Sequence, residues 1–146
     1  MRPLKQSALF NKVSPEEAKL LVRLAHKETF TTGSIIFSQG SRAEKIYLLG
    51  YGNIALKTAF SDGLEITYEM ITRKGEAFGL SALVAPFRFT TTAVCLEKTE
   101  ARVFPQKDLI KTLSSHSLLG FKVMQNLCVL LARRVERTRR LLAGQV

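Results

Sequence analysis

The sequence predicts a mainly β domain, an antiparallel sandwich or jelly-roll barrel, that is flanked by helices at both ends. From residue 29 to residue 105, short runs rich in Ile, Val, Thr, Tyr and Phe are separated by glycine at about ten-residue spacing. A helix-start signal precedes this region, and a long segment of helical periodicity follows it. The 146 residues, 46% of them hydrophobic, suffice for one core, so we expect a single domain over residues 1–146.

The N-terminal helical part is expected over residues 13–28. The stretch SPEE at 14–17 combines a capping serine, a proline at the first helical position and two acids at the positive end of the helix dipole. Apolar residues then recur three and four positions apart, which predicts a helix through about His26. We interpret His26 as a boundary residue rather than as a ligand.

The β region is expected to run from residue 29 to residue 105. Five runs have strand composition: residues 34–40, 45–60, 64–75, 88–97 and 100–105. Asp62-Gly63 lies between two of them and predicts a tight hairpin, because such a turn requires positive φ. Successive short strands joined in this way favour antiparallel pairing.

Two helices are expected in the C-terminal part, residues 106–146. The first should pack Leu109, Ile110 and Leu113 against the core. The segment 114–117 interrupts the pattern, and its serines could cap the second helix.

The second of these helices carries an apolar seam with alternating spacings of three and four, as in a coiled coil. The seam consists of Phe121, Met124, Cys128, Leu131, Val135, Thr138 and Leu142. We predict that the seam pairs with the same helix of a second copy, which makes the protein a homodimer. The alternative is that its first part, from Phe121 to Cys128, packs on the β region instead.

Two stretches resemble a known family when their order is considered. TGSIIFSQGSRAEKIYLLGYGNIAL, with glycines at 33, 40 and 52, and KGEAFGLSAL, with glycines at 75 and 79, resemble the cyclic nucleotide-binding domain. That domain occurs in bacterial catabolite-activator-type regulators and in the regulatory subunits of cyclic-AMP-dependent kinase. The resemblance covers residues 13–142 and implies a jelly-roll barrel, or double-stranded β-helix, with a long C-terminal dimerisation helix. It also implies a phosphate-binding cassette at 75–92.

The cassette departs from the family pattern at two positions. Leu80 stands where the family has a glutamate that hydrogen-bonds the ribose, and leaving a buried hydroxyl unpaired costs about 1–3 kcal/mol. Phe89 stands where the family has the arginine that pairs with the cyclic phosphate, and Arg88 lies one residue earlier. In a strand this shift turns Arg88 to the opposite face, whereas in a loop Arg88 could still reach the pocket.

The candidate anion site follows from this resemblance. A short helix beginning near Gly79 would point free N–H groups at an anion, and Arg88 would be the side chain whose loss weakens anion binding most. Glu76 is interpreted as a turn or surface residue. The candidate nucleotide-binding or anion-binding residues are Gly75, Phe78, Gly79, Leu80, Ser81, Ala82, Arg88, Phe89, Thr90 and Thr92.

The resemblance implies a regulatory or sensory module rather than an enzyme. Its ligand would be a noncanonical nucleotide or another phosphate-bearing small molecule, and tight binding of ordinary cyclic AMP is not expected. The alternative is a degenerate scaffold that contacts another protein, with Leu80 and Phe89 filling the pocket. We find no nucleophile–base set, no metal-ligand spacing and no certain cofactor, so no catalytic residue is predicted.

The formal charge of +10 is concentrated near the C-terminus, in Arg133, Arg134, Arg137, Arg139 and Arg140. A further alternative is therefore nonspecific contact with a nucleic-acid backbone. We find no element for reading DNA bases, so sequence-specific DNA binding is not expected. No stretch has the length of a membrane span, which favours a cytoplasmic protein, and Cys95 and Cys128 are predicted to be reduced, buried thiols.

Overall fold

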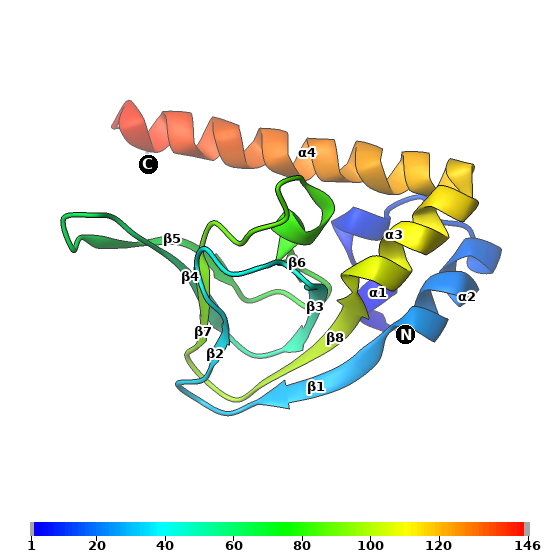
Figure 1. Cartoon of the computed structure of the whole chain (residues 1–146), viewed down its shortest axis with the longest axis horizontal. Coiled ribbons are helices and arrows are strands. Elements are labelled where there is room, and N and C mark those ends of the chain that lie inside the picture. The colour runs from blue at the N-terminus through cyan, green and yellow to red at the C-terminus, as the bar shows by residue number, and fades with distance from the viewer. Residues whose placement is uncertain (1, 145–146) are drawn as a thin grey trace.

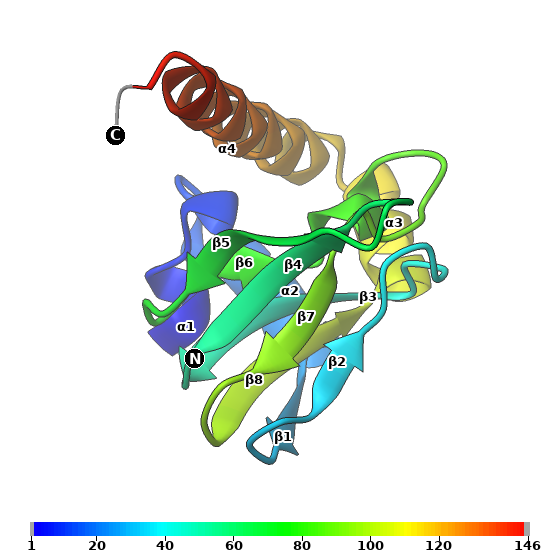
Figure 2. The ribbon, with the colours of Figure 1, turned by 90° about the vertical axis from the view of Figure 1, so that its left-hand side faces the viewer.

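The computed structural model describes residues 2–144 and consists of two four-stranded antiparallel sheets, with a long helix lying over them (Figure 1). One sheet has the order β1-β8-β3-β6, and the other has the order β2-β7-β4-β5, whose strands lie side by side in Figure 2. The strands are β1 His26–Phe30, β2 Ile35–Phe37, β3 Lys45–Tyr51, β4 Ile54–Ala59, β5 Glu65–Ile71, β6 Ala77–Phe78, β7 Thr92–Cys95 and β8 Thr99–Pro105. The predicted mainly β, jelly-roll fold with flanking helices is confirmed.

The core lies between the sheets and beneath the helices. In β3, the four consecutive residues from Ile46 to Leu49 are all buried, because the strand is covered on both faces. The short helix α1, Arg2–Lys5, contacts β3 from one of these sides. In β8, burial alternates instead, with Ala101 and Val103 inaccessible to solvent. This core holds the two sheets in a fixed relation and so positions the loops between them.

The predicted hairpin at Asp62-Gly63 joins β4 and β5. Gly63 has φ +87°, and the Leu64 N–H donates a 2.9 Å hydrogen bond to Asp62 Oδ1, as in an Asx turn. The hairpin projects beyond the rest of the molecule, at the left of Figure 1. On β5, Ile66 and Tyr68 are 47% and 38% exposed, so the rest of the described chain covers these side chains only in part.

Helix α2, Pro15–Leu24, begins with the predicted cap. The Ser14 hydroxyl accepts from the Glu17 N–H at 3.1 Å, and a Glu17 carboxylate oxygen accepts from the Ser14 N–H at 2.9 Å. The hydrogen bond from the Lys122 ammonium, 2.7 Å from Glu17, and then the bond from the Ser14 N–H hold the pKa of the Glu17 carboxyl below its ordinary value. The pair joins α2 to the long helix.

The predicted C-terminal limit of this helix was wrong. Ala25 is extended and ends α2 at Leu24, and His26 starts β1 because its backbone pairs with Val103 of β8. The His26 side chain contacts the Glu28 carboxylate. The sequence reasoning also missed the 3₁₀ turn η1, Ala8–Phe10, where Leu9 and Phe10 are buried.

The two predicted C-terminal helices are α3, Gln106–Ser115, and α4, Ser117–Leu142. Leu109 and Leu113 are buried as expected, and Ile110 packs against the core. The expectation that a serine caps α4 was wrong, because the N-cap is His116 and its side chain makes no capping bond. The helices approach closely at Gly120, where a Cβ would lie 2.4 Å from the Leu113 carbonyl oxygen.

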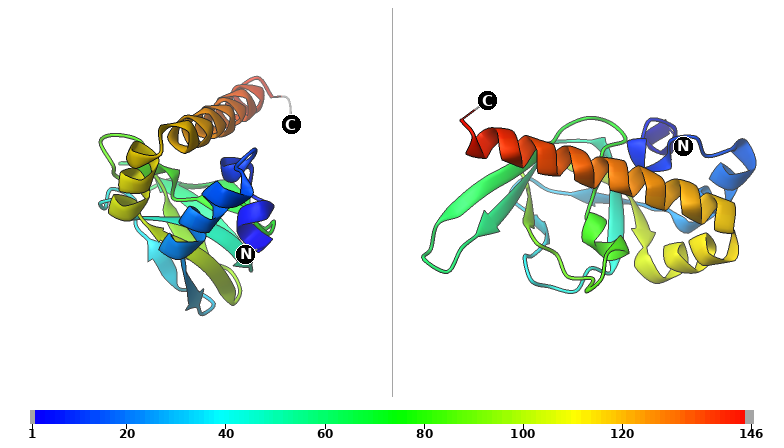
Figure 3. Two further views of the ribbon diagram at one scale, coloured as in Figure 1. Left: turned by 90° about the vertical axis from the view of Figure 1, so that its right-hand side faces the viewer. Right: turned by 90° about the horizontal axis from the view of Figure 1, so that it is seen from above.

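Helix α4 crosses the molecule above the sheets, as the right-hand view of Figure 3 shows. Its buried apolar contacts with the core come from Leu119, Val123 and Leu127, and Leu130 and Leu131 add partly buried ones. Phe121, at 63% exposure, and Met124 lie outside this face. The alternative that the first part of the seam packs on the β region was therefore wrong.

The two thiols have different environments. Cys95 is buried, and this burial raises the pKa of its thiol despite a hydrogen bond with Thr99. Cys128 is exposed on α4, so the prediction of burial was wrong for this residue. Within residues 2–144, no helix combines the length and apolarity that crossing a membrane would require.

Candidate ligand-binding site

A cavity of about 620 Å³ lies between the cassette, the sheet formed by β2, β4 and β5, and the C-terminal half of α4. We call it the cassette cavity. Its cassette side consists of Gly79, Leu80, Ser81, Val84, Phe89, Thr90 and Thr91. Its strand side consists of Phe37, Leu56, Thr58 and Tyr68, and its helix side of Leu131, Arg134, Val135, Thr138 and Arg139. The volume is within the range of ordinary small-molecule sites.

The cassette turn is built around Gly79. This residue has φ +76° and precedes the 3₁₀ helix η2, Leu80–Leu83, which confirms the predicted short helix. A Cβ at position 79 would lie 3.1 Å from the Tyr47 ring and 3.3 Å from the Lys45 carbonyl oxygen, so the backbone sits close to β3. Leu80 is buried and lines the cavity without an acceptor group.

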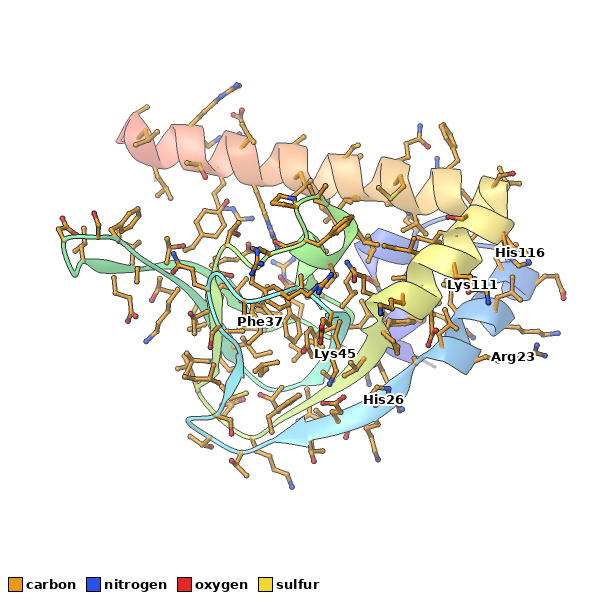
Figure 4. The ribbon with its side chains drawn as sticks, viewed as in Figure 1. Arg23, His26, Phe37, Lys45, Lys111 and His116 are labelled. Atoms are coloured by element: carbon orange, nitrogen blue, oxygen red, sulfur yellow. The ribbon has the colours of Figure 1, made fainter. Side chains whose placement is uncertain are left out.

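An aromatic stack forms one wall of the cavity. The Phe37 and Phe89 rings lie parallel at 3.8 Å between centroids, and Tyr47 stacks on Phe78 at 5.0 Å behind them. Burial is the main cause that raises the pKa of Tyr47 to about 12, and the Glu28 charge adds to the shift. Figure 4 shows Phe37 within the β region, far from His116 at the α3 end. Because Phe89 stacks on Phe37, its ring forms part of the wall and leaves the cavity open.

Arg88 points away from the cassette cavity. Its guanidinium donates a 3.1 Å hydrogen bond to the Gly40 carbonyl, and its backbone forms an isolated bridge with Arg42. The segment before β7 is a loop, but its backbone is fixed by bonds of Phe87 and Phe89 with the 40–43 segment. Of the two orientations considered from the sequence, the structure has the outward one.

The cations of the cavity come from α4. Arg134 and Arg139 both line it, and Arg134 Nε lies 3.1 Å from Glu69 Oε1. Arg137 is 3.5 Å from the other oxygen of Glu69, a carboxylate whose side chain is only 8% exposed. One carboxylate of β5 thus holds two arginines of the helix above the cavity.

The structure brings together only part of the predicted site. Gly79, Leu80, Ser81, Phe89 and Thr90 line the cassette cavity, and so do three residues predicted for the dimer seam: Leu131, Val135 and Thr138. The residues outside its lining are Gly75, Phe78, Ala82, Arg88 and Thr92. Thr92 instead accepts a 2.9 Å hydrogen bond from the Gln39 N–H.

The sequence reasoning missed the strand side of the cavity and both of its arginines. The available signal was the arginine run at 133–140, for which the sequence suggested contact with a nucleic-acid backbone rather than a place in a cavity wall. Glu76 lies in the turn, as interpreted, where its carboxylate accepts from the N–H groups of Thr72 and Arg73. Within residues 2–144, no three His, Cys, Asp or Glu side chains are placed to hold a metal ion.

The sequence profile described as "Cyclic nucleotide-binding domain" matches residues 27–116. The chain belongs to the cyclic nucleotide-binding domain family. Over 132 residues it is 30% identical to the "Cyclic AMP receptor protein" of Thermus thermophilus, covering 90% of this chain and 59% of that protein. The chain therefore spans less than two thirds of this curated relative.

Solved structures of cyclic nucleotide-binding domains agree with the fold. The catabolite activator protein of Thermus thermophilus superposes with a TM-score of 0.79 at 28% identity, covering 94% of this chain and 62% of that chain. A cyclic nucleotide-binding domain from Methylobacillus flagellatus gives a TM-score of 0.84 at 17% identity, covering 99% and 81%. The second similarity concerns the fold alone.

Proposed function

We infer that this domain is a regulatory module that binds a phosphate-bearing small molecule in the cassette cavity and transmits its presence through α4. The observation that carries this proposal is the composition of the cavity wall. The cassette supplies one side of the cavity, and the C-terminal half of α4 supplies the other, including Arg134 and Arg139. A ligand there touches the core and the helix at once, so it can favour one position of the helix over another.

The chemistry of the cavity suits an anion with an attached ring. Guanidinium groups bind phosphate oxygens through pairs of charge-assisted hydrogen bonds, and Arg134 and Arg139 are the candidates here. Hydroxyls of Ser81, Thr90 and Thr91 lie on the cassette side and can bond further oxygens. The side chains of Phe37 and Phe89 give the cavity an apolar wall that a base could contact. These features support a nucleotide-like ligand.

Leu80 argues against the ribose contact typical of the family. With no acceptor at this position, the cavity favours a ligand whose sugar is differently placed, or a ligand without a ribose. This supports a noncanonical nucleotide or another phosphate-bearing molecule over tightly bound cyclic AMP.

A second candidate function is a scaffold that binds another protein and no small ligand. The burial of Leu80 and Phe89 favours it, because both replace polar family contacts by apolar side chains. The volume of about 620 Å³ argues against a scaffold. Protein interiors are closely packed, so a cavity that binds no ligand would be expected to be filled by side chains.

We also propose that the domain acts as a homodimer through α4. The exposed apolar side chains of Phe121 and Met124 support this, and Cys128 is exposed on the same helix. Three seam residues also line the cassette cavity: Leu131, Val135 and Thr138. The proposed dimer seam and the cavity therefore share one segment of α4. Pairing of the helices would then depend on what the cavity holds.

The decisive experiment is calorimetric titration of the ligand-free protein with cyclic AMP, cyclic GMP and a cyclic dinucleotide. For the ligand that binds, we expect Arg139→Gln to weaken affinity by about tenfold, the loss of one charged hydrogen-bond partner. Arg88→Gln is the matched control and should leave affinity within about twofold, because its guanidinium bonds Gly40 outside the cavity.

Two outcomes would contradict the proposal. Absence of heat with all three ligands up to millimolar concentration would contradict a cyclic-nucleotide ligand and favour the scaffold or a sensor of another molecule. A large loss in Arg88→Gln with none in Arg139→Gln would mean that the phosphate lies on the loop side and that α4 does not contact it.

A further inference from the structure

A second cavity, of about 320 Å³, adjoins the cassette cavity at Leu80 and Arg134, which line both. We call it the basic cavity. It is enclosed by η1, by the turn between β5 and β6, and by α4. The turn contributes Arg73 and Lys74, and α4 contributes Arg133, Arg134 and Arg137. Five cationic side chains from two separate elements therefore surround one hollow.

The acids of this cavity are already engaged. Glu69 pairs with Arg134 and Arg137, at 3.1 Å and 3.5 Å. The Glu76 carboxylate accepts from two backbone N–H groups of its own turn, at 3.1 Å and 2.9 Å. Among the side chains that the structure describes, no ion pair is formed by Arg73, Lys74 or Arg133. The lining thus has five cations and two carboxylates, which leaves an excess of three positive charges around one space.

We propose that the basic cavity is a second binding site, separate from the cassette cavity, and that it takes the diphosphate group of a small molecule. The cations stand on two facing elements, the β5–β6 turn and α4, so a group with two linked phosphates can pair with both at once. A single phosphate has fewer oxygens to share between the two elements, so we expect it to bind more weakly. Because like charges held together repel one another, an anion bound between them also relieves a cost of the folded state.

Because the two cavities share residues, binding in the basic cavity is expected to affect the cassette cavity. Leu80 and Arg134 line both cavities, and Glu69 holds Arg134 between them. A diphosphate in the basic cavity competes with Glu69 for the arginines of α4. This effect on the cassette cavity rests on the proposed function, whereas binding of diphosphate to the basic cavity does not.

The test is calorimetric titration of the full chain with pyrophosphate and, separately, with orthophosphate at low ionic strength, where charge interactions are least screened. The variant Arg73→Gln/Lys74→Gln/Arg133→Gln removes the three unpaired cations of the basic cavity. Its matched control is Lys27→Gln/Lys98→Gln/Lys111→Gln, which removes the same charge from exposed positions outside both cavities. Circular dichroism confirms that both variants are folded.

We expect pyrophosphate to bind the unmodified chain at least about tenfold more tightly than orthophosphate, since it pairs with both elements. The basic-cavity variant should lose at least about tenfold in pyrophosphate affinity, and the control should stay within about twofold. Equal losses in both variants would reduce the effect to net charge and overturn the proposal. The proposal is also overturned if pyrophosphate gives no heat, or if Arg139→Gln alone abolishes its binding, because Arg139 lines only the cassette cavity.

Discussion

The two halves of α4 are held to the domain by different forces. From residue 117 to residue 127, Leu119, Val123 and Leu127 are buried against the core, and Lys122 pairs with Glu17 of α2. From residue 128 to residue 142 every side chain is at least partly exposed. The contacts of this half with the β region include the ion pairs of Arg134 and Arg137 with Glu69. Full burial of apolar side chains anchors the first half, whereas the second half has only the partly buried Leu130 and Leu131, the ion pairs and the cassette cavity beneath it.

If the proposed ligand binds in the cassette cavity, this difference favours the second half of the helix as the part that responds to it. Displacing the first half would expose several apolar side chains, each worth about 1.5–3 kcal/mol. Displacing the second half costs partly solvated ion pairs and can be offset by contacts with a bound anion. Helix α4 thus consists of a firmly packed segment, residues 117–127, and a more weakly held segment, residues 128–142.

The largest expected effect comes from removing the anchor. Leu119→Ala should lower the free energy of unfolding by about 2–5 kcal/mol, because Leu119 is inaccessible to solvent and its loss leaves a void. Leu118→Ala is the matched control at the neighbouring position, where leucine is 64% exposed and the loss should stay within about 0.5 kcal/mol. Urea unfolding curves measure both. Equal losses would mean that α4 is not anchored by this face.

The seam gives the next effect, on association rather than on folding. Phe121→Glu/Met124→Glu should convert the proposed dimer into a folded monomer in analytical ultracentrifugation, because it places charge in the proposed apolar interface. These two residues are preferable to Leu131 and Val135, which also line the cassette cavity.

The control for the seam is Ile35→Glu/Leu96→Glu, which makes the same change at exposed apolar residues of the β region. It should leave the mass unchanged. A dimer that persists in the seam variant, or that dissociates in the control, would place the interface elsewhere.

The smallest expected effect concerns the ion pairs that hold the second half of α4. Glu69→Gln removes the carboxylate shared by Arg134 and Arg137 and should cost about 1–2 kcal/mol, with amide exchange rising in residues 131–142 and not in 119–127. Glu65→Gln is the control on the same strand, since its 3.7 Å contact with Lys57 is exposed and worth about 0–1 kcal/mol. Faster exchange along the whole helix would show that the two halves move together.

Some features of the fold could be predicted because they depend on a few neighbouring residues. The cap at Ser14, the hairpin at Asp62-Gly63 and the turn at Gly79 each rest on local bonds or on a positive φ. The end of α2 was misplaced because pairing with β8, a strand about 75 residues away in the chain, takes His26 into a sheet. The periodicity of neighbouring residues does not predict pairing between strands that are distant in the sequence.

The candidate site shows the same division. The sequence by itself determined the family, the two-sheet fold and a cassette turn with glycine where the backbone approaches β3, since each follows from patterns along the chain. Only the tertiary structure decided that Arg88 bonds Gly40 and that Arg134 and Arg139 face the cavity. The orientation of a side chain on α4 depends on which face of the helix meets the sheets. Because α4 carries apolar residues on more than one face, its periodicity does not specify that choice, and packing against α3 and η1 does.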